Sequence, residues 1–498
     1  MMSQRSFAVQ SATIQGVKAL PVLVEVVISN GIPSFSIVGM ADATILESRE
    51  RVKAALRASG FVMPTDKIVI NLAPGALRKT GSGFDLPIAL GILAATEQIN
   101  PELISSSLIV GELLLDGSVR APKGMLAYQK CAIEEGFNLL TGVSETGMFD
   151  MEGLVCYTLE RLAYIREGHF STHKKLELPE SDEQIDYAEV MGHEAAKRAL
   201  QVAAAGNHGV LMVGPPGSGK TMLAQRFSTI LPKLTESEKI EAALVHSVAG
   251  EDISSILAGH RPFRSPHHSA TAAGLIGGGK PPHPGEASLA HRGVLFLDEL
   301  AEFKTSVLQT LRQPMETGSI MLTRVEGTYS FPAKFQLLAA TNPCPCGYFG
   351  DPSGKCRCGV SAVRAYQNRM GGPLIDRIDM RIDVWRESSD ELFGKQQGKS
   401  SAELRDGVER ARAFAKRRSA GRNAVSKGLR ALKDLCFFDK QAESFFFSLT
   451  KSQEMSARSI AKTLLLSRTI ADIAESKQVT QVHIAEAFTL RFGGGLSW

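Results

Sequence analysis

The 498-residue sequence has no apolar run of about 18 residues, the length that a helix needs to cross a bilayer. Its first residues, MMSQRSFAVQSATIQ, contain no apolar h-region, so we expect no secretory signal. Cysteine is also sparse. Four of the seven cysteines lie between Cys344 and Cys358, and only three occur in the rest of the chain. The cysteine content fits a reducing cytosol better than a disulfide scaffold, so we expect a cytoplasmic protein without membrane attachment.

A large excess of one charge is absent as well. Lys and Arg number 56 against 52 Asp and Glu, a net charge of +4. This balance permits binding to a polyanion such as DNA but does not require it. The content of 44% hydrophobic and 22% charged residues is ordinary for a globular chain, and the length suggests roughly two to four domains.

Three regions differ in their hydrophobic pattern. Residues 1–170 contain alternating β-branched runs such as VLVEVVIS between helical patterns, which predicts an α+β domain. Residues 171–185 are polar without periodicity and are predicted to be a linker. Residues 186–390 contain the short apolar runs GVLMVG, GVLFLDEL and KFQLLAATN, typical of parallel strands buried on both faces. Residues 391–498 show helical patterns only, so the fold class is α/β with a helical C-terminal part.

A glycine-rich turn, GPPGSGKT, directly follows the apolar run GVLMV and precedes a helical pattern. The spacing matches a phosphate-binding P-loop, in which backbone N–H groups cradle phosphates at the start of a helix. Lys220 is predicted to reach the β- and γ-phosphates of ATP, and Thr221 to ligate Mg²⁺. The predicted ATP-binding residues are Gly214, Pro215, Pro216, Gly217, Ser218, Gly219, Lys220 and Thr221.

Two further apolar runs end in polar residues suited to ATP hydrolysis. VLFLDEL places Asp298 where it would position Mg²⁺ and Glu299 where it would activate the attacking water. The alternative is a pair of solvent-facing charges at a strand end. KFQLLAATN ends in Asn342, which could hydrogen-bond the γ-phosphate or the lytic water.

This order of motifs resembles AAA+ ATPases, and longer stretches resemble their magnesium-chelatase-like branch. Those stretches include HRPFRSPHHSATAAGLIGGG, PHPGEASLAHRGVLFLDELAEF, LRQPMETGSI and LIDRIDM, and the resemblance extends over essentially the whole chain. It implies a P-loop AAA+ core with a C-terminal helical lid, ATP and Mg²⁺ as cofactors, and a homo-hexameric ring. It also implies that Arg377 is an arginine finger acting on a neighbouring subunit's ATP and that Arg458 is the sensor-2 arginine of the lid. On spacing alone, either arginine would be an ordinary surface or salt-bridge residue.

The first domain resembles the peptidase domain of Lon, including the stretch GELLLDGSVRAPKG. Cleavage of the Lon type needs a serine nucleophile and a lysine base. Those two positions fall at Gly83 and Leu126, and the nearby Ser82 and Lys123 are displaced from them. We therefore expect a proteolytically inactive domain that contributes to DNA contact or assembly.

Basic residues in two segments of the second region suggest contact with DNA. The first segment contains Arg261, Arg264 and Lys280 among glycines, and the second is a predicted β-hairpin with Arg324 near its tip. Basic loops at the pore of a ring suit a phosphate backbone, whereas the alternative is a solvated loop. A further basic run, KRRSAGRNAVSKGLRALK, fits a solvated surface of the lid.

The resemblance implies an ATP-driven DNA motor, a branch-migration helicase that acts on recombination intermediates in natural transformation. Single-stranded, double-stranded or branched DNA and a recombinase are then the expected partners. The alternative is a chelatase-like motor subunit that remodels a protein partner.

The stretch TNPCPCGYFGDPSGKCRCG predicts a second kind of site directly after Asn342. Two C-x-C pairs are separated by a glycine-containing loop that can bring them together. Four thiolates favour tetrahedral Zn²⁺, with Cys344, Cys346, Cys356 and Cys358 as its ligands. The alternative is a set of free thiols packed under a loop.

Overall fold

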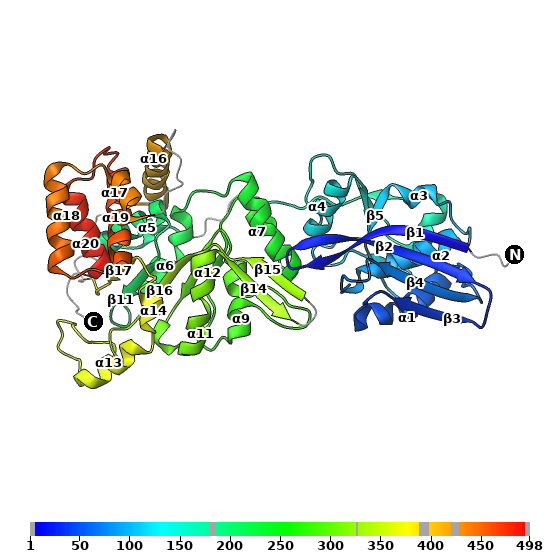
Figure 1. Ribbon diagram of the computed structural model, residues 1–498, viewed down its shortest axis with the longest axis horizontal. Coiled ribbons are helices and arrows are strands. Elements are labelled where there is room, and N and C mark those ends of the chain that lie inside the picture. Colours follow the sequence, from blue (N-terminus) through cyan, green and yellow to red (C-terminus); the bar gives the residue numbers. More distant parts are fainter. Residues whose placement is uncertain (1–4, 180–184, 325–326, 388–397, 420–427, 494–498) are drawn as a thin grey trace.

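The computed structural model describes residues 5–179, 185–324, 327–387, 398–419 and 428–493. Its three parts follow one another along one long axis, with the N-terminal domain at one end and the helical C-terminal part at the other (Figure 1). Within the described ranges, no helix combines the length and the apolar character needed to cross a membrane.

The first sheet of the N-terminal domain has the strand order β1-β2-β4-β3. Its strands are β1 (Arg5–Gln15), β2 (Lys18–Ser29), β3 (Ser34–Val38) and β4 (Lys67–Ala73). Buried residues alternate along β2, as the VLVEVVIS pattern predicted, because one face of the sheet covers the core. The helices here are α1 (Ala43–Ala58) and α2 (Asp85–Ala95), and every residue of α2 is buried.

A second sheet completes this domain in the order β10-β9-β8-β5. The remaining elements are α3 (Glu102–Ser105), β5 (Ser107–Ile109), β6 (Glu112–Leu113), β7 (Val119–Arg120), α4 (Met125–Glu135), β8 (Asn138–Thr141), β9 (Cys156–Thr158) and β10 (Ser171–Thr172). Strand β10 pairs with β9, so the segment predicted as a linker begins inside the domain. Backbone pairing at a sheet edge needs no apolar periodicity, which is why the sequence pattern missed it.

The central part is built on a five-stranded parallel sheet in the order β12-β13-β16-β11-β17. Its strands are β11 (Val210–Val213), β12 (Phe263–Arg264), β13 (Val294–Leu297), β16 (Gln336–Thr341) and β17 (Met380–Asp383). Every residue of β11, β13 and β16 is buried, which confirms the prediction of strands covered on both faces. Only the ends of these strands are therefore free to carry polar chemistry.

Helices surround this sheet, and a two-stranded hairpin extends from it (Figure 1). The helices are α5 (Glu194–Gly206), α6 (Lys220–Gln225), α7 (Glu236–Ala249), α8 (Ser254–Leu257), α9 (Ala272–Ile276), α10 (Glu286–Leu289), α11 (Thr305–Thr310), α12 (Arg312–Thr317), α13 (Val360–Asn368) and α14 (Gly372–Ile375). The hairpin consists of β14 (Ser319–Arg324) and β15 (Gly327–Pro332), with Arg324 paired to Gly327. The predicted hairpin with Arg324 near its tip is thus present.

Among the described residues, the C-terminal part contains helices only, as predicted. These are α16 (Ser401–Ser419), α17 (Leu429–Cys436), α18 (Lys440–Ser452), α19 (Ala457–Ile473) and α20 (Gln481–Phe492). Leu404 of α16 and Leu466 of α19 belong to the same buried cluster as Val210 and Met212 of β11. The helical part is therefore packed against the central sheet.

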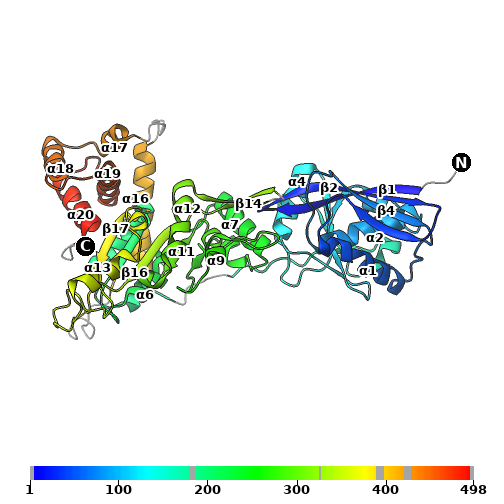
Figure 2. The ribbon, with the colours of Figure 1, turned by 60° about the horizontal axis from the view of Figure 1, so that its bottom comes forward.

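The N-terminal domain also packs directly on the central part. Leu126 of α4 and Ala243 of α7 share one buried apolar cluster, and the Leu126 backbone N–H donates to Ser247 Oγ at 3.3 Å. The β1–β2 hairpin meets the β14–β15 hairpin, where Gln15 Nε2 donates to the Thr328 carbonyl at 3.5 Å (Figure 2). These contacts join two domains that the sequence pattern treated as separate.

Candidate active site

The P-loop connects β11 to α6, as the sequence predicted. Two glycines have a steric reason to be there. A β-carbon at Gly214 would lie 1.9 Å from the Val384 carbonyl oxygen, and Gly219 has a φ of +83°. A side chain at Gly214 would collide with the Val384 carbonyl, and glycine adopts the left-handed backbone of Gly219 at the lowest cost. The chain can therefore turn close to Val384 before α6 begins.

Lys220 is held inside this loop. Its Nζ donates hydrogen bonds to the Gly214 and Pro215 carbonyls, both at 2.8 Å, and lies 3.4 Å from Asn342 Oδ1. Burial lowers the pKa of Lys220 to about 8, Asp298 opposes that shift and Arg386 adds to it. The ammonium group is therefore poorly solvated in the absence of phosphates, which makes it a ready partner for them.

Thr221 and Asp298 come together at the same place, with Thr221 Oγ1 donating to Asp298 Oδ2 at 2.7 Å. Adjacent oxygen ligands of an octahedral Mg²⁺ lie about 3 Å apart, so this hydroxyl and carboxylate fit such an ion. Glu299 follows Asp298 and adopts a left-handed backbone, φ 50° and ψ 47°, which is unusual for glutamate. Its half-exposed carboxylate lies at the same edge of the sheet as the P-loop.

These residues meet because β13, β16 and β11 are neighbours and run in the same direction. Their carboxyl ends deliver Asp298, Asn342 and the P-loop to one edge of the sheet. The structure therefore brings together all the site residues that the sequence predicted after β11, β13 and β16. Chemically, it can hold a phosphate chain and a hard cation beside a carboxylate base.

The two predicted arginines lie at the opposite edge. Strand β17 runs parallel to β11, with Val210 opposite Met380, so Arg377 precedes the strand while the P-loop follows β11. Arg377 forms an ion pair with Glu316, and Arg458 lies 3.0 Å from the same carboxylate. A strand of four residues separates the two edges by about 13 Å, so neither arginine is placed beside its own chain's P-loop.

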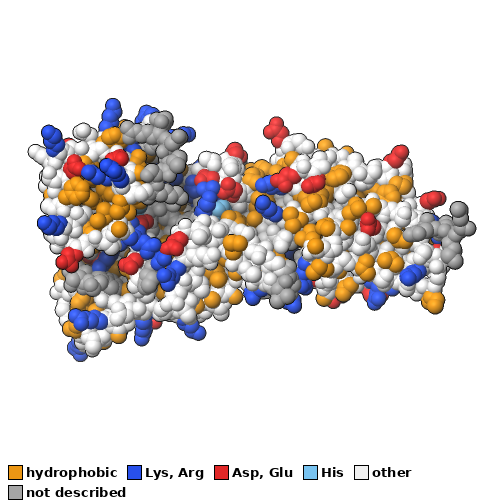
Figure 3. All heavy atoms as spheres, viewed as in Figure 1, with side chains coloured by type: hydrophobic (Ala, Val, Ile, Leu, Met, Phe, Trp, Pro, Cys, Tyr) orange, Lys and Arg blue, Asp and Glu red, His pale blue; other side chains and the backbone are white. Residues whose placement is uncertain are grey.

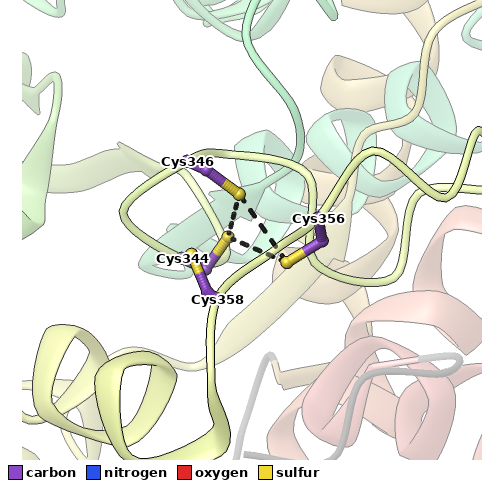
Figure 4. Close-up of side chains that lie close together, drawn as sticks. All are labelled: Cys344, Cys346, Cys356 and Cys358. Atoms are coloured by element: carbon purple, nitrogen blue, oxygen red, sulfur yellow. Dashed lines mark hydrogen bonds between the residues drawn. The ribbon is translucent and has the colours of Figure 1, made fainter.

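The four clustered cysteines converge on one point (Figure 4). Their sulfur atoms all lie within 4.8 Å of one another, and Cys344 Sγ is 3.3 Å from Cys346 Sγ and 3.8 Å from Cys356 Sγ. Four thiolates about 2.3 Å from a tetrahedral zinc would be about 3.8 Å apart, so the cluster could bind this ion. Burial opposes ionisation of Cys346, but the Tyr348 backbone N–H and neighbouring thiols lower its pKa to about 6.

The structure corrects half of the predicted DNA contacts. Arg261 is mostly buried and donates to the Pro232 and Arg292 carbonyls and to Glu238. Arg264 pairs with Glu286 at 2.7 Å and with Glu251 at 3.0 Å. Both guanidinium groups thus stabilise the fold, and neither is offered to a phosphate backbone.

Lys280 and Arg324 remain exposed in the structure, so they are retained as candidate DNA contacts. Elsewhere, lysine and arginine side chains are scattered among acidic ones on the face shown in Figure 3. The surface charge is therefore mixed on this face, in agreement with the near-neutral composition.

The structure adds residues that the sequence did not indicate. Arg386, just after β17, donates to the Pro216 carbonyl at 2.7 Å and lies 5.5 Å from the Tyr348 ring centroid. Glu387 accepts a hydrogen bond from the His193 backbone N–H at 2.6 Å. The sequence offered one signal for Arg386 and Glu387, because both are charged residues at the end of an apolar run. Their place beside the P-loop follows only from the strand order, in which β17 borders β11.

Comparison with known protein families gives one match for each of the three parts of the chain. The central part, residues 186–392, matches the family described as magnesium chelatase, subunit ChlI. Residues 24–141 match the family described as subunit ChlI of Mg-chelatase, and residues 398–491 match its C-terminal family. Fold, site and matches together define a magnesium-chelatase-like ATPase of the AAA+ class.

Relatives of full length narrow this class. The YifB protein of Salmonella typhimurium is 38% identical over 96% of this chain and 95% of its own. Competence protein ComM of Haemophilus influenzae is 38% identical over 97% of both chains. The Magnesium-chelatase 67 kDa subunit of Chlorobaculum parvum is 27% identical over 32% of this chain and 23% of its own. The chain belongs to the ComM/YifB family.

The low pKa of Lys220 gives a prediction for ATP binding. Phosphates bind the protonated lysine, so affinity is full below a pH of about 8, and above it a proton must be taken up. We expect the Kd for a non-hydrolysable ATP analogue to rise by up to about tenfold per pH unit from pH 8 to 9.5. Titration calorimetry in two buffers of different ionisation enthalpy measures both the affinity and the proton uptake.

Lys220→Arg provides the matched control, because arginine stays charged over this range. The variant should bind the analogue more weakly but with a flat pH profile. An identical pH profile in the wild type and in Lys220→Arg would show that another group titrates.

Proposed function

We propose that this chain is an ATP-driven DNA motor, a branch-migration helicase that works as a hexameric ring on recombination intermediates in natural transformation. The observation that carries the proposal is the separation of Lys220 and Glu299 from Arg377 across one parallel sheet. An ATPase site completed by arginines of a neighbouring copy requires a repeating head-to-tail contact. A closed ring satisfies this requirement, and the competence role in the ComM name supports DNA as its substrate.

Each residue of the site then has a chemical role. Lys220 binds the β- and γ-phosphates, and Thr221 and Asp298 would hold a Mg²⁺ ion, which would neutralise charge on those phosphates. Glu299 orients and deprotonates the attacking water, and Asn342 hydrogen-bonds the γ-phosphate or that water. Arg377 and Arg458 of the neighbouring subunit place positive charge where it develops in the transition state.

The N-terminal domain is proposed to be Lon-like in fold and inactive as a peptidase. Ser82 Oγ donates to Glu112 Oε2 at 3.1 Å, and the Lys123 side chain lies against Gly250 of the central part. Leu126, at the family's lysine position, is 1% exposed in the interdomain cluster. These contacts support a role of this domain in joining the parts of the motor.

A motor subunit that remodels a protein partner is the rival function. The match to ComM over 97% of this chain favours DNA over that rival, since the 67 kDa chelatase subunit of Chlorobaculum parvum matches 32% of it. The deciding experiment measures ATPase activity with and without branched DNA. Stimulation by DNA supports the motor proposed here, and unchanged activity with every DNA form contradicts it.

The role of Arg377 predicts complementation between inactive variants. Arg377→Ala should keep ATP affinity and lose turnover by about 100-fold or more. The Lys220→Ala variant should not bind ATP, but its intact Arg377 can still act at the ATP site of a neighbouring subunit. An equimolar mixture should recover about a quarter of the wild-type turnover, because only one interface in four pairs an intact P-loop with an intact finger.

Arg410→Ala, which removes an exposed arginine from α16, controls for the loss of one positive charge. This variant should keep the wild-type turnover. An inactive mixture, despite co-assembly verified by native mass spectrometry, rules out a contribution of Arg377 to the neighbour.

The position of Arg324 near the tip of the β14–β15 hairpin leads to a prediction about where DNA contacts the proposed ring. Replacing Arg324 and Lys280 with alanine should weaken DNA binding and reduce the slope of log affinity against log salt by up to about 2, one per lost phosphate contact. Fluorescence anisotropy over a salt titration measures both quantities. A paired Lys440→Ala and Lys451→Ala change on α18 is the control; equal slopes for the two double variants would place the DNA path elsewhere.

The cysteine cluster is proposed to hold a structural Zn²⁺. Protein purified without added metal should contain close to one zinc per chain by elemental analysis. Changing Cys344 and Cys356 to serine should remove the metal and lower the melting temperature, because two of four ligands are lost. Cys156→Ser, which alters a thiol outside the cluster, should retain the zinc. Metal-free wild-type protein of full stability would refute the zinc proposal.

A further inference from the structure

A cavity lies at the amino edge of the central sheet, away from the ATP site. Its volume is about 600 Å³, within the range of pockets that hold small molecules. Gly206 and Asn207, which precede β11, and Gln336, the first residue of β16, line it. The P-loop and Asn342 follow the same two parallel strands, so the sheet itself separates this cavity from the ATP site.

Cationic side chains outnumber carboxylates around the cavity. The charged residues that line it are Arg261, Arg292, Lys334, Arg412, Glu238 and Glu316. Both carboxylates are already shared, Glu238 by Arg261 and Arg292 and Glu316 by Arg377 and Arg458. Among the described residues, neither Lys334 nor Arg412 forms an ion pair. The cavity therefore carries positive charge that the chain itself does not neutralise.

Arg412 is the more deeply buried of these two cations. Its Nη2 donates to the Ala204 carbonyl at the end of α5 at 2.6 Å, while its Nε and Nη1 have no hydrogen-bond partner among the described residues. Burial lowers the pKa of Arg412 to about 10, and the neighbouring Arg261 adds to that shift. The charges of Glu238 and Glu409 oppose it only in part. An anion in the cavity would supply both the missing acceptors and the missing negative charge.

Lys334 brings a second cation to the cavity from the segment before β16. Its backbone is fixed on both sides, because its N–H donates to His291 Nδ1 at 3.0 Å and its carbonyl accepts from the Arg292 N–H at 2.7 Å. Its aliphatic stem covers Gly318, where a β-carbon would lie 2.7 Å from Lys334 Cγ. The stem is thus confined, while the exposed side chain keeps its ammonium group available to a ligand.

Apolar side chains form much of the remaining wall. They are Ala205, Leu231, Pro314, Met315, Ala333 and Phe335. A bare phosphate would leave this wall uncovered, whereas a phosphorylated molecule with an apolar or aromatic part would cover it. A DNA backbone needs a groove along which successive phosphates lie, but here two unneutralised cations share one cavity. The lining therefore favours a small ligand over a nucleic acid.

We infer that this cavity is a binding site for a phosphorylated small molecule of nucleotide size, whose phosphate is held by Arg412 and Lys334. The charges on both partners strengthen the hydrogen bonds between such cations and a phosphate. The site is separate from the P-loop and does not depend on the proposed DNA motor. Because Glu316 also lines the cavity, the bound phosphate would lie near the carboxylate that pairs with Arg377.

Titration calorimetry with GDP and with inorganic pyrophosphate tests the site. The measurements use full-length Lys220→Ala protein, so that the ATP site does not bind the probe. GDP should bind near one per chain with a Kd of tens of micromolar, roughly. Pyrophosphate should bind about tenfold more weakly, because it cannot cover the apolar wall.

Substitutions in the same background locate the binding. Arg412→Gln should raise the Kd for GDP by about tenfold or more, and Lys334→Gln by about threefold or more, since each removes a charge-assisted hydrogen bond. Arg412→Lys keeps the charge and should retain part of the affinity. Lys416→Gln removes an exposed charge from the same helix and should leave the Kd unchanged. Melting temperatures check that each variant is folded, and the exposed Lys334 provides the test even if Arg412→Gln does not fold.

Absence of GDP binding up to about 1 mM overturns the inference, and so does a Kd that neither cavity substitution changes. An equal loss of affinity in Lys416→Gln would assign the effect to net charge and also overturns it. Equal affinities for GDP and pyrophosphate contradict a ligand of nucleotide size. Binding of a single-stranded oligonucleotide in place of GDP, with the same dependence on Arg412, would make the site a nucleic-acid contact. None of these results measures DNA stimulation of the ATPase, so failure here is distinct from failure of the proposed function.

Discussion

The direction of the central strands is the constraint on which the chemistry of this chain depends. All five run the same way, and three of them are buried along their whole length, so polar groups collect only where strands begin or end. The carboxyl edge receives Lys220, Asp298 and Glu299. The amino edge receives Arg377 together with its partner Glu316. In the proposed ring, hydrolysis depends on assembly because these edges can meet only between two copies.

The cysteine loop and the P-loop are two sites that share a boundary. A β-carbon at Gly347 would lie 2.5 Å from Pro216 Cδ, so the cysteine loop rests directly on the phosphate loop. Arg386 strengthens this boundary because it donates to the Pro216 carbonyl and lies over the Tyr348 ring. A metal that stiffens the cysteine loop would therefore stabilise the P-loop through contact alone, with no role in the reaction.

Much of the site was predictable because its residues are encoded locally. The P-loop glycines, the acidic pair after β13 and the two C-x-C pairs each lie within one short segment. Apolar runs also predicted the buried strands, and parallel strand ends then place Asn342 near Lys220. What the sequence could not show was which charges neutralise one another.

Arg261 and Arg264 illustrate this limit. Their counts and spacing suggested a DNA loop, yet their partners Glu238, Glu251 and Glu286 come from other elements. The pairing of Glu316 with both Arg377 and Arg458 depends likewise on how α12, α19 and the sheet pack. The sequence gives the number of charged residues, but the ion pairs that they form follow only from the packed structure.

The interdomain contacts connect the N-terminal domain with the hairpin that is proposed to contact DNA. Helix α4 packs on α7 through a buried cluster, which fixes the N-terminal domain to the central part. From this fixed position the β1–β2 hairpin reaches β15, where a β-carbon at Gly16 would lie 2.7 Å from the Ser330 carbonyl oxygen. The β14–β15 hairpin therefore has the N-terminal domain on one side and α9 on the other. In the proposed motor, a displacement of this hairpin by DNA would therefore act on the N-terminal domain as well as on α9.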